Sequence, residues 1–420
     1  MTNHPMAGHA GRLDRPPGLS ADTLVIACGV VAALHVGKLP PALPVLRDAL
    51  GVSLVQAGFL LSMVQAAAMT LALALGLGVA RIGLRRSLIA GLLVLAASSV
   101  AGSFAHNAGG LLLGRAAEGV GFLLVSLAAP ALIRALVPPQ QLSLRMGLWG
   151  TYMPLGTALA LLVGPVVMTG AGWRGWWLGL GLLAAAMALW AWQALGWQTP
   201  GPEQPPTIAA PPAAWTAVLR DTLTQRGPWL VALAFGAYSS QWITVIGFLP
   251  TIYADAGVAQ GMAGLLTALA AAVNISGNVW AGHLLHRGRP PVHLLLIGFT
   301  TMGLAAFTAF GLPDTVPAAG RYAAVLSFSA VGGLIPGTLF ALAVRVAPHD
   351  KAVPAVVGWT LQCSAFGQFV GPPAAAWWTS HHGGWSQTWV TTAGSAAVGV
   401  VLVLALRRTL QHPTPRERPQ

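Results

Sequence analysis

Apolar residues are gathered into long runs along this chain, and short polar segments separate them. A helix that crosses a bilayer needs about 20 consecutive apolar residues. The ten-residue segments of alternating apolar and polar positions that a membrane β-barrel requires are not seen. We therefore expect an all-α membrane protein with twelve transmembrane helices. The predicted spans are 23–45, 54–77, 87–105, 111–136, 144–169, 175–196, 228–252, 259–285, 292–311, 320–346, 352–378 and 386–406.

The longest polar interruption is rich in proline and divides the chain near its middle. We interpret it as a cytoplasmic linker between two bundles of six helices. The polar start of the chain lacks the short apolar core of a cleavable signal peptide, so the first span is expected to remain. The predicted organisation is a cytoplasmic tail at 1–22, an N-terminal bundle at 23–196, the linker at 197–227, a C-terminal bundle at 228–406 and a cytoplasmic tail at 407–420.

The composition agrees with a membrane protein. Hydrophobic residues make up 55% of the chain and charged residues only 8%, and the mean hydropathy is +0.69. Soluble domains carry about 25% charged residues, so a water-facing surface cannot be built here. The net charge of +12 could indicate nucleic acid, but the arginines lie in short clusters between apolar runs. We expect no nucleic-acid partner.

The positions of Lys and Arg orient the spans. With the N-terminus in the cytoplasm, most of the 22 Lys and Arg residues fall in cytoplasmic segments, as the positive-inside rule requires. Both termini are then cytoplasmic. We expect a multi-pass monomer in a bacterial cytoplasmic membrane. Tryptophans near the predicted outer ends, such as Trp173, Trp176 and Trp177, are expected to form an interface belt.

The two halves of the chain are related by an internal repeat. Several short motifs recur at one constant offset, which chance matches in a chain rich in Gly, Ala and Leu do not explain. Parallel repeats of this kind place a substrate site between the halves, near the membrane midplane. The matched pairs include Leu43-Pro44 with Leu249-Pro250, Ala57-Gly58 with Ala263-Gly264, Gly114-Arg115 with Gly320-Arg321 and, one position further apart, Gly164-Pro165 with Gly371-Pro372.

Three motifs give the chain a family resemblance. The loop after the second span, the fourth span and the fifth span resemble conserved motifs of the major facilitator superfamily. The first motif departs from the family at Ala80, where an acidic residue is usual. The matching residues are Gly76, Arg81, Gly83 and Arg85 in the loop, Arg115 with Glu118 in the fourth span, and Gly156, Gly164 and Pro165 in the fifth. Those of the loop and the fifth span are our candidate conformational motif.

Within that family, the second half is most similar to the cyanate and 2-nitroimidazole permease branch, on the strength of Asn274, Gly277-Asn278 and Arg287-Gly288. The resemblance implies a secondary transporter that works by alternating access, and not an enzyme. No phosphate-binding loop ending in GK[ST] occurs, so we expect a proton gradient as the energy source. We expect no cofactor and no metal, because no cluster has metal-ligand spacing.

Ionisable residues at membrane depth are functional candidates, because burying charge in a bilayer is costly. His35 and Lys38 share one face of the first span, and Arg115 and Glu118 share one face of the fourth. A basic pair at a central cavity would attract an anion, while His35 and Glu118 could carry protons. The structural alternatives are a histidine that only bonds a neighbouring helix, a lysine that reaches the outer headgroups, and an ion pair that only stabilises its helix.

Amide and indole side chains in the second half suggest a polar cavity, although they could equally tie helices together.

We assign proton coupling to His35, Arg115 and Glu118. The substrate is expected to be a small organic anion, and efflux of neutral or weakly basic compounds is the alternative; a non-transporting receptor or a membrane-embedded enzyme fits less well. The predicted substrate-binding residues are His35, Lys38, Gln241, Trp242, Asn274, Asn278 and Gln362.

Overall fold

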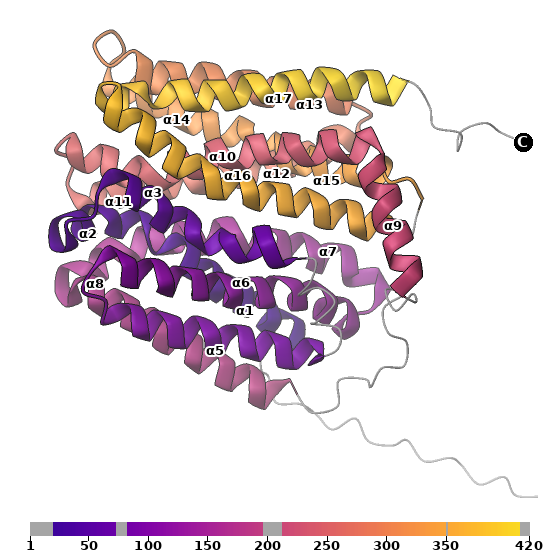
Figure 1. Ribbon diagram of the computed structural model, residues 1–420, viewed down its shortest axis with the longest axis horizontal. Helices are drawn as coiled ribbons and strands as arrows, with labels where there is room; N and C mark the ends of the chain where they lie inside the picture. The colour runs from indigo at the N-terminus through magenta and orange to yellow at the C-terminus, as the bar shows by residue number, and fades with distance from the viewer. Residues whose placement is uncertain (1–19, 73–81, 196–211, 350–351, 412–420) are drawn as a thin grey trace, which may run out of the picture.

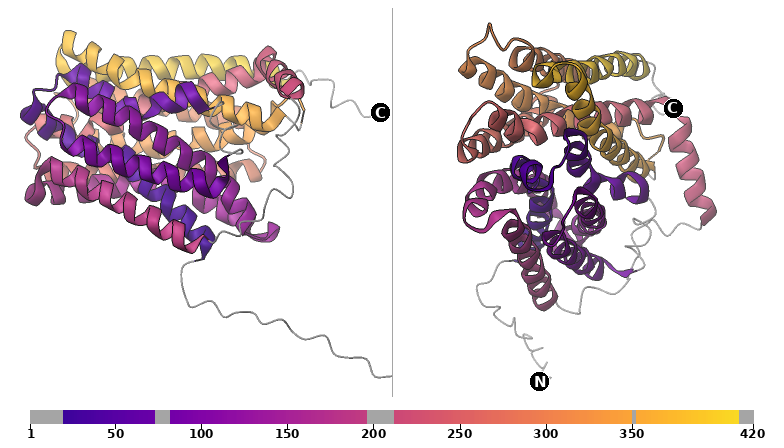
Figure 2. Two further views of the ribbon diagram at one scale, coloured as in Figure 1. Left: turned by 60° about the horizontal axis from the view of Figure 1, so that its bottom comes forward. Right: turned by 60° about the vertical axis from the view of Figure 1, so that its left-hand side comes forward.

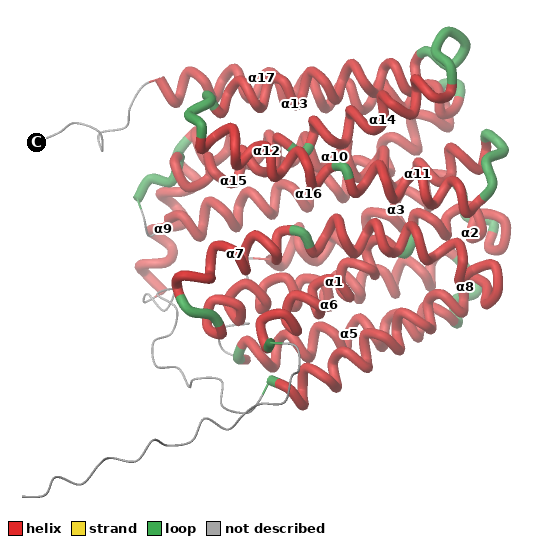
Figure 3. The backbone as a smooth tube through the Cα atoms, turned by 180° about the vertical axis from the view of Figure 1, so that it is seen from behind, coloured by secondary structure: helices red, strands yellow, loops and turns green. Residues whose placement is uncertain are grey.

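The protein is described from a computed structural model that covers residues 20–72, 82–195, 212–349 and 352–411. In these ranges all of the regular secondary structure is helix, and loops or turns join the helices (Figure 3). The N-terminal half contains α1 (Ala21–Gly37), η1 (Pro40–Ala42), α2 (Leu43–Leu50), α3 (Leu54–Ser62), η2 (Met63–Gln65), α5 (Leu84–Ser103), α6 (Ala108–Leu136), α7 (Pro139–Gly150) and α8 (Tyr152–Ala194).

The C-terminal half begins with a short helix inside the predicted linker. Its elements are α9 (Pro212–Thr224), α10 (Arg226–Asp255), α11 (Gln260–Ala272), α12 (Asn274–His286), α13 (Pro291–Ala306), the π-helical turn η3 (Phe307–Gly311), α14 (Ala318–Gly332), α15 (Leu334–Arg345), α16 (Val353–His381), η5 (Gly384–Gln387) and α17 (Thr388–Gln411).

In the part of the chain that the structure describes, ten helical stretches are long and apolar enough to cross a membrane. One of them, Leu148–Ala194, has 47 residues and would be about 70 Å long if straight, more than twice the thickness of a bilayer core. This stretch breaks at Gly172, which has a φ of 66° that glycine adopts without strain. It therefore supplies two membrane crossings. The helix α16 is less apolar than the ten but has 29 residues. Within the described residues, each of the twelve predicted spans thus falls mainly on helix.

Several predicted spans are interrupted rather than continuous, and the one at 144–169 is divided at Thr151 between α7 and α8. The first was expected at 23–45, but α1 ends at Gly37, before Pro40 and Pro41. Proline cannot donate a backbone hydrogen bond and clashes with the preceding turn, so the helix restarts as η1 and α2. The spans at 259–285 and 320–346 are divided at Val273 and Gly333. These two breaks lie against each other, since a Cβ on Gly333 would be 2.3 Å from the Asn274 carbonyl oxygen.

The two halves form two helical bundles that lie side by side, with the indigo-to-magenta helices in one and the orange-to-yellow helices in the other (Figures 1 and 2). They meet along three seams, where α3 contacts α16, α8 contacts α11, and η1 with α2 contacts α10. The C-terminal end of α17 lies at the same end of the molecule as α9, whereas α2 and α11 lie at the opposite end (Figure 1). In the orientation predicted from the charge pattern, that opposite end is the outer end of the protein.

The outer ends of the two bundles make two equivalent close contacts with each other. A Cβ on Gly58 of α3 would be 2.7 Å from the Cα of Pro373, and one on Gly264 of α11 would be 2.7 Å from the carbonyl oxygen of Leu161 and from Cγ of Pro165. Gly58 and Gly264 are repeat partners, and so are Pro165 and the neighbouring Pro372. We call these contacts the two Gly–Pro seats. They show that the repeat builds the same close approach twice.

A polar contact lies at the same outer end. Asp255, at the end of α10, accepts a hydrogen bond from the Trp385 indole at 2.7 Å and lies 3.6 Å from the Arg47 guanidinium of the other half. Both members of this ion pair are partly exposed, at 34% and 47%. An exposed pair of this kind contributes at most about 1 kcal/mol. The seal at this end therefore depends on packing more than on charge.

Candidate functional site

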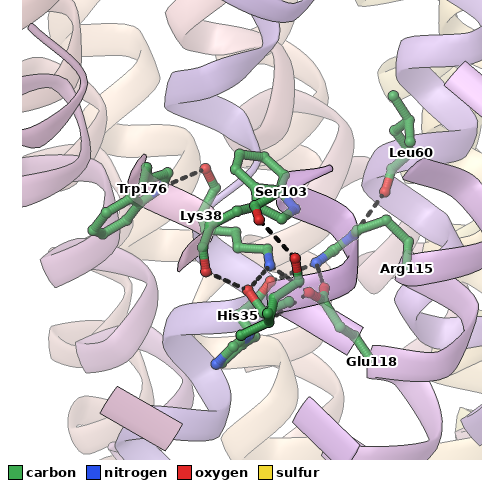
Figure 4. A network of polar contacts seen from close by, with 10 residues as sticks. His35, Lys38, Leu60, Ser103, Arg115, Glu118 and Trp176 are labelled. Atoms are coloured by element: carbon green, nitrogen blue, oxygen red, sulfur yellow. Dashed lines mark hydrogen bonds and ion pairs between the residues drawn. The ribbon is translucent and has the colours of Figure 1, made fainter. Parts of the chain in front are cut away.

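The four ionisable residues predicted at membrane depth meet in one cluster within the N-terminal half (Figure 4). His35, Lys38, Arg115 and Glu118 are each at most 1% exposed. The two carboxylate oxygens of Glu118 are engaged separately: Oε1 accepts a hydrogen bond from Lys38 Nζ, and Oε2 accepts one from Arg115 Nη1 at 2.6 Å. One acid is therefore held between two cations in the interior of the bundle. We call these four residues the charge cluster.

The end of α1 positions Lys38. The helix ends at Gly37, one residue before Lys38. The Lys38 carbonyl has no helical partner and accepts a hydrogen bond from the Trp176 indole at 3.1 Å. The ammonium group also donates to Ser99 Oγ at 2.8 Å, and Ser99 in turn donates to the Trp177 carbonyl at 2.7 Å. The ammonium lies 4.6 Å from the centre of a Trp177 ring, a favourable cation–π distance. The outer-headgroup alternative for Lys38 is wrong.

Arg115 fixes the relative position of three helices. Its Nη1 donates to the His35 carbonyl of α1 at 2.6 Å, and its Nε donates to the Leu60 carbonyl of α3 at 3.2 Å. The third nitrogen, Nη2, is buried without a hydrogen-bond partner among the described residues. Guanidinium groups have several donors in a rigid plane, which suits a hub of this type. A change in the charge on Glu118 therefore alters the contacts of α1, α3 and α6 together, because Arg115 bonds to all three helices.

His35 is the member of the charge cluster whose side chain makes no hydrogen bond to the described residues. Its Nδ1 lies 3.8 Å from Glu118 Oε1, beyond hydrogen-bond distance, and neither ring nitrogen has a hydrogen-bond partner in the described part of the chain. A neutral imidazole needs a donor for one nitrogen and an acceptor for the other. With His35 neutral, the cluster carries more positive than negative charge. Such a site can bind an anion, and Glu118 and His35 can each accept a proton.

In the C-terminal half, Asn274 lies at the centre of a neutral network. Its Nδ2 donates to the Ser329 carbonyl at 2.8 Å and to the Tyr238 hydroxyl at 3.0 Å. Asn278 Nδ2 donates to the Asn274 carbonyl at 3.1 Å, and the Trp242 indole donates to Ser329 Oγ at 3.2 Å. Asn274 and Trp242 are thus engaged in bonds that join α10, α12 and α14, whereas the bonds of Asn278 stay within α12.

Two glutamines keep an unused acceptor. Gln241 donates only to the Ala237 carbonyl of its own helix at 3.3 Å, and its Oε1 is buried without a hydrogen-bond partner. Gln362 donates to the Met69 carbonyl across the seam between the halves at 2.7 Å, and its Oε1 is likewise unpartnered among the described residues. These two amides have free hydrogen-bonding capacity, in contrast to Asn274, whose amide oxygen and nitrogen are both engaged.

The family model described as Major Facilitator Superfamily matches residues 25–364. The chain belongs to the major facilitator superfamily. Its resemblance to that family is confirmed, and it is therefore a multi-pass membrane transporter and not an enzyme. No curated protein sequence matches the chain.

Two solved structures of a bacterial homologue of the human lysosomal transporter Spinster share the fold. The inward-facing and unoccupied form is 16% identical, with a TM-score of 0.76 over 95% of this chain and 100% of that chain. The inward-facing and occupied form is also 16% identical, with a TM-score of 0.75 over 94% and 98%. These matches give no support to the cyanate and 2-nitroimidazole permease branch.

The superfamily motif residues lie at helix ends and close helix contacts. Gly76 and Arg81 lie outside the described residues. Gly83 precedes α5 with a φ of 95°, and Arg85 donates to the Trp192 carbonyl of α8 at 2.5 Å. The fifth-span residues lie against α1 and η1: a Cβ on Gly156 would be 2.7 Å from the Val30 carbonyl oxygen, and one on Gly164 would be 3.1 Å from Pro41. Pro165 belongs to a Gly–Pro seat. Their conformational role stays a prediction.

Three members of the site were not predicted from the sequence. Ser99 gave no signal, because serines in apolar helices are common and usually bond their own backbone. Trp176 and Trp177 were assigned to an interface belt together with Trp173, but all three are at most 5% exposed. Their spacing of three and four positions puts them on one helical face, and that face lies against the bundle and not against lipid.

If Asn274 only joins helices, Asn274→Ala should lower stability and leave substrate affinity unchanged. The variant loses its bonds to Tyr238 and Ser329, each worth about 0.6–2 kcal/mol in a membrane interior. Thermal unfolding in detergent would measure the loss, and concentration-dependent uptake would measure affinity. A stable variant whose affinity falls at least about tenfold would instead make Asn274 a substrate contact.

Proposed function

We propose that this transporter carries a small organic anion together with protons. The observation that supports this most is the charge cluster, in which Glu118 is held between Lys38 and Arg115 with no exposure to water. A buried group of charges with a positive excess is costly and is stabilised by an additional anion. The substrate class thus rests on the charge cluster and not on resemblance to a branch of the family.

Glu118 and the substrate would compete for the same two cations. When Glu118 is protonated it no longer balances Lys38 and Arg115, and two buried cations are left without a counter-ion. An anion that enters the cluster then takes the place of the carboxylate. The proton and the anion are therefore bound together and released together, which is the requirement for symport. His35, 3.8 Å from Glu118 Oε1, is suited to pass the proton to or from the carboxylate.

The charge cluster is adjacent to the outer seal, which links it to alternating access. Leu39 follows Lys38 in the chain, and the Leu60 carbonyl is bonded by Arg115. Leu39, Leu60 and Leu61 share one hydrophobic core with Phe248 and Ala376 of the other half. A rearrangement at Glu118 would therefore move residues that hold the two halves together. The bundles at 23–196 and 228–406 would rock about the cluster, and both termini would stay in the cytoplasm.

Of the predicted substrate contacts in the second half, we retain Gln241 and Gln362 because each has an unused amide oxygen. Asn274 and Trp242 are assigned to joining helices, and Asn278 is assigned to supporting Asn274 from the same helix. We propose that the protein acts as a monomer in a bacterial cytoplasmic membrane, since the charge cluster lies within one chain.

Transport by the purified protein in liposomes tests the proposal. With an alkaline interior, we expect accumulation of a small carboxylate only when the pH gradient is present, and no accumulation of neutral or weakly basic compounds. Lys38→Met should lose this uptake, while Arg47→Gln, which removes a partly exposed cation outside the charge cluster, should keep it. Gradient-driven export of neutral or weakly basic compounds would overturn the proposal and favour the efflux alternative. A protein that moves no solute would favour a receptor.

A further inference from the structure

A groove lined by both polar and apolar side chains lies at the cytoplasmic end of the C-terminal bundle, away from the charge cluster. It has a volume of about 390 Å³ and lies where α9 meets α10, beside the last turns of α17. In Figure 1 this is the end at which α9 and the end of α17 are found. Its polar lining consists of Thr224, Gln225, Arg226, Trp229, Arg408 and Thr409.

Two guanidinium groups line this groove without a counter-ion. Among the described residues, neither Arg226 nor Arg408 takes part in an ion pair or hydrogen bond. The carboxylate of α9, Asp221, lies 3.9 Å from Arg220 and 3.6 Å from His349 and does not line the groove. Arginine binds phosphate through paired, charge-assisted hydrogen bonds. The charge of the groove therefore fits a phosphate group.

An apolar surface continues from the groove toward the membrane interior. Leu230 and Ala405 complete the lining, and one turn deeper Leu233 and Leu404 are 42% and 45% exposed on α10 and α17, which lie side by side. Val401, a further turn along α17, is 65% exposed. A free phosphate would use only the polar end of this site. A ligand with a phosphate head and an apolar chain matches the whole of it.

We propose that this groove binds the phosphate headgroup of an anionic phospholipid from the cytoplasmic leaflet. The headgroup lies between Arg226 and Arg408, and an acyl chain follows the α10–α17 surface past Leu233 and Leu404. The Trp229 indole, which donates to the Leu223 carbonyl at 2.8 Å, marks the level of the membrane interface. The bound lipid thereby connects the linker helix α9 and the start of α10 to the last turns of α17.

Thermal unfolding of the full-length protein in detergent, with added phosphatidylglycerol, tests this site. We expect a concentration-dependent rise in the unfolding temperature that phosphatidylcholine and inorganic phosphate do not give. In the double variant Arg226→Gln/Arg408→Gln the apparent affinity should fall about 30-fold, which corresponds to about 1 kcal/mol for each basic residue near the membrane surface. Arg407→Gln is the matched control, because Arg407 is exposed on the same helix and does not line the groove.

Native mass spectrometry provides a second readout that does not depend on stability. The parent protein and Arg407→Gln should retain a phosphatidylglycerol adduct that the double variant loses. Equal stabilisation by phosphatidylcholine would overturn headgroup recognition, and equal stabilisation by inorganic phosphate would show a free-anion site. Equal losses in the control and the double variant would overturn the assignment to this groove.

Discussion

Glu118→Gln should unfold at a clearly lower temperature than the parent protein and should lose uptake driven by a pH gradient. The substitution keeps the shape of the side chain but leaves Lys38 and Arg115 buried without a counter-ion. Breaking a buried ion pair from one side costs about 3–5 kcal/mol. Thermal unfolding in detergent measures the loss of stability, and uptake into liposomes measures the loss of coupling.

Two comparisons separate charge imbalance from other effects of the substitution. Asp255→Asn makes the same chemical change at the partly exposed pair with Arg47 and should cost at most about 1 kcal/mol. Glu118→Gln/Lys38→Met removes one charge of each sign and should regain most of the stability while remaining inactive. A Glu118→Gln protein as stable as its parent would show that the ion pairs do not stabilise the bundle as argued.

Gly58→Ala and Gly264→Ala should each open the outer end of the protein. The added methyl group would lie 2.7 Å from the Cα of Pro373 in the first case and from the Leu161 carbonyl oxygen in the second, and backbone atoms cannot move aside. Overpacking of this size costs about 1–3 kcal/mol, which is about a 5- to 150-fold shift in a two-state equilibrium. Labelling of Ser62→Cys by a membrane-impermeant maleimide from outside should rise accordingly, because Ser62 is fully buried four residues deeper than Gly58.

The labelling experiment needs a background without Cys28 and Cys363 and a matched glycine. Gly179→Ala is suitable, since its methyl group meets nothing within 4 Å. Labelling should stay at the level of the unsubstituted protein in this control. The account of the Gly–Pro seats would be wrong if Gly58→Ala and Gly264→Ala also left the labelling rate unchanged, or if only one of them raised it.

The positions of the helices could largely be predicted from the sequence, because the bilayer imposes a simple rule on the chain. A span must be apolar over its length and must satisfy its own backbone, so hydropathy predicts where helices occur. The breaks were not predicted. The end of α1 at Gly37 depends on two prolines whose effect hydropathy does not measure, and the divisions at Val273 and Gly333 depend on contact between two helices that are distant in the sequence.

The site was predicted only in part, for a related reason. His35, Lys38, Arg115 and Glu118 could be identified because buried charge is rare and costly. Their pairing could not, since Lys38 and Glu118 come from different helices, and spacing along one helix predicted only the Arg115–Glu118 contact. The positions of Ser99 and Trp177 depend in the same way on how α5 and α8 pack against α1. Which residues become partners across helices depends on how the helices pack. The hydropathy of a single segment carries no information about that packing.

The most direct test of the coupling between proton and anion is the number of protons taken up when an anion binds. Purified protein in weakly buffered detergent would be mixed with a transported carboxylate while a pH-sensitive dye records proton exchange. The account predicts uptake of about one proton for each anion bound, because the anion displaces Glu118 only when that carboxylate is protonated. Anion binding without proton uptake, or equal uptake by Glu118→Gln, would contradict it.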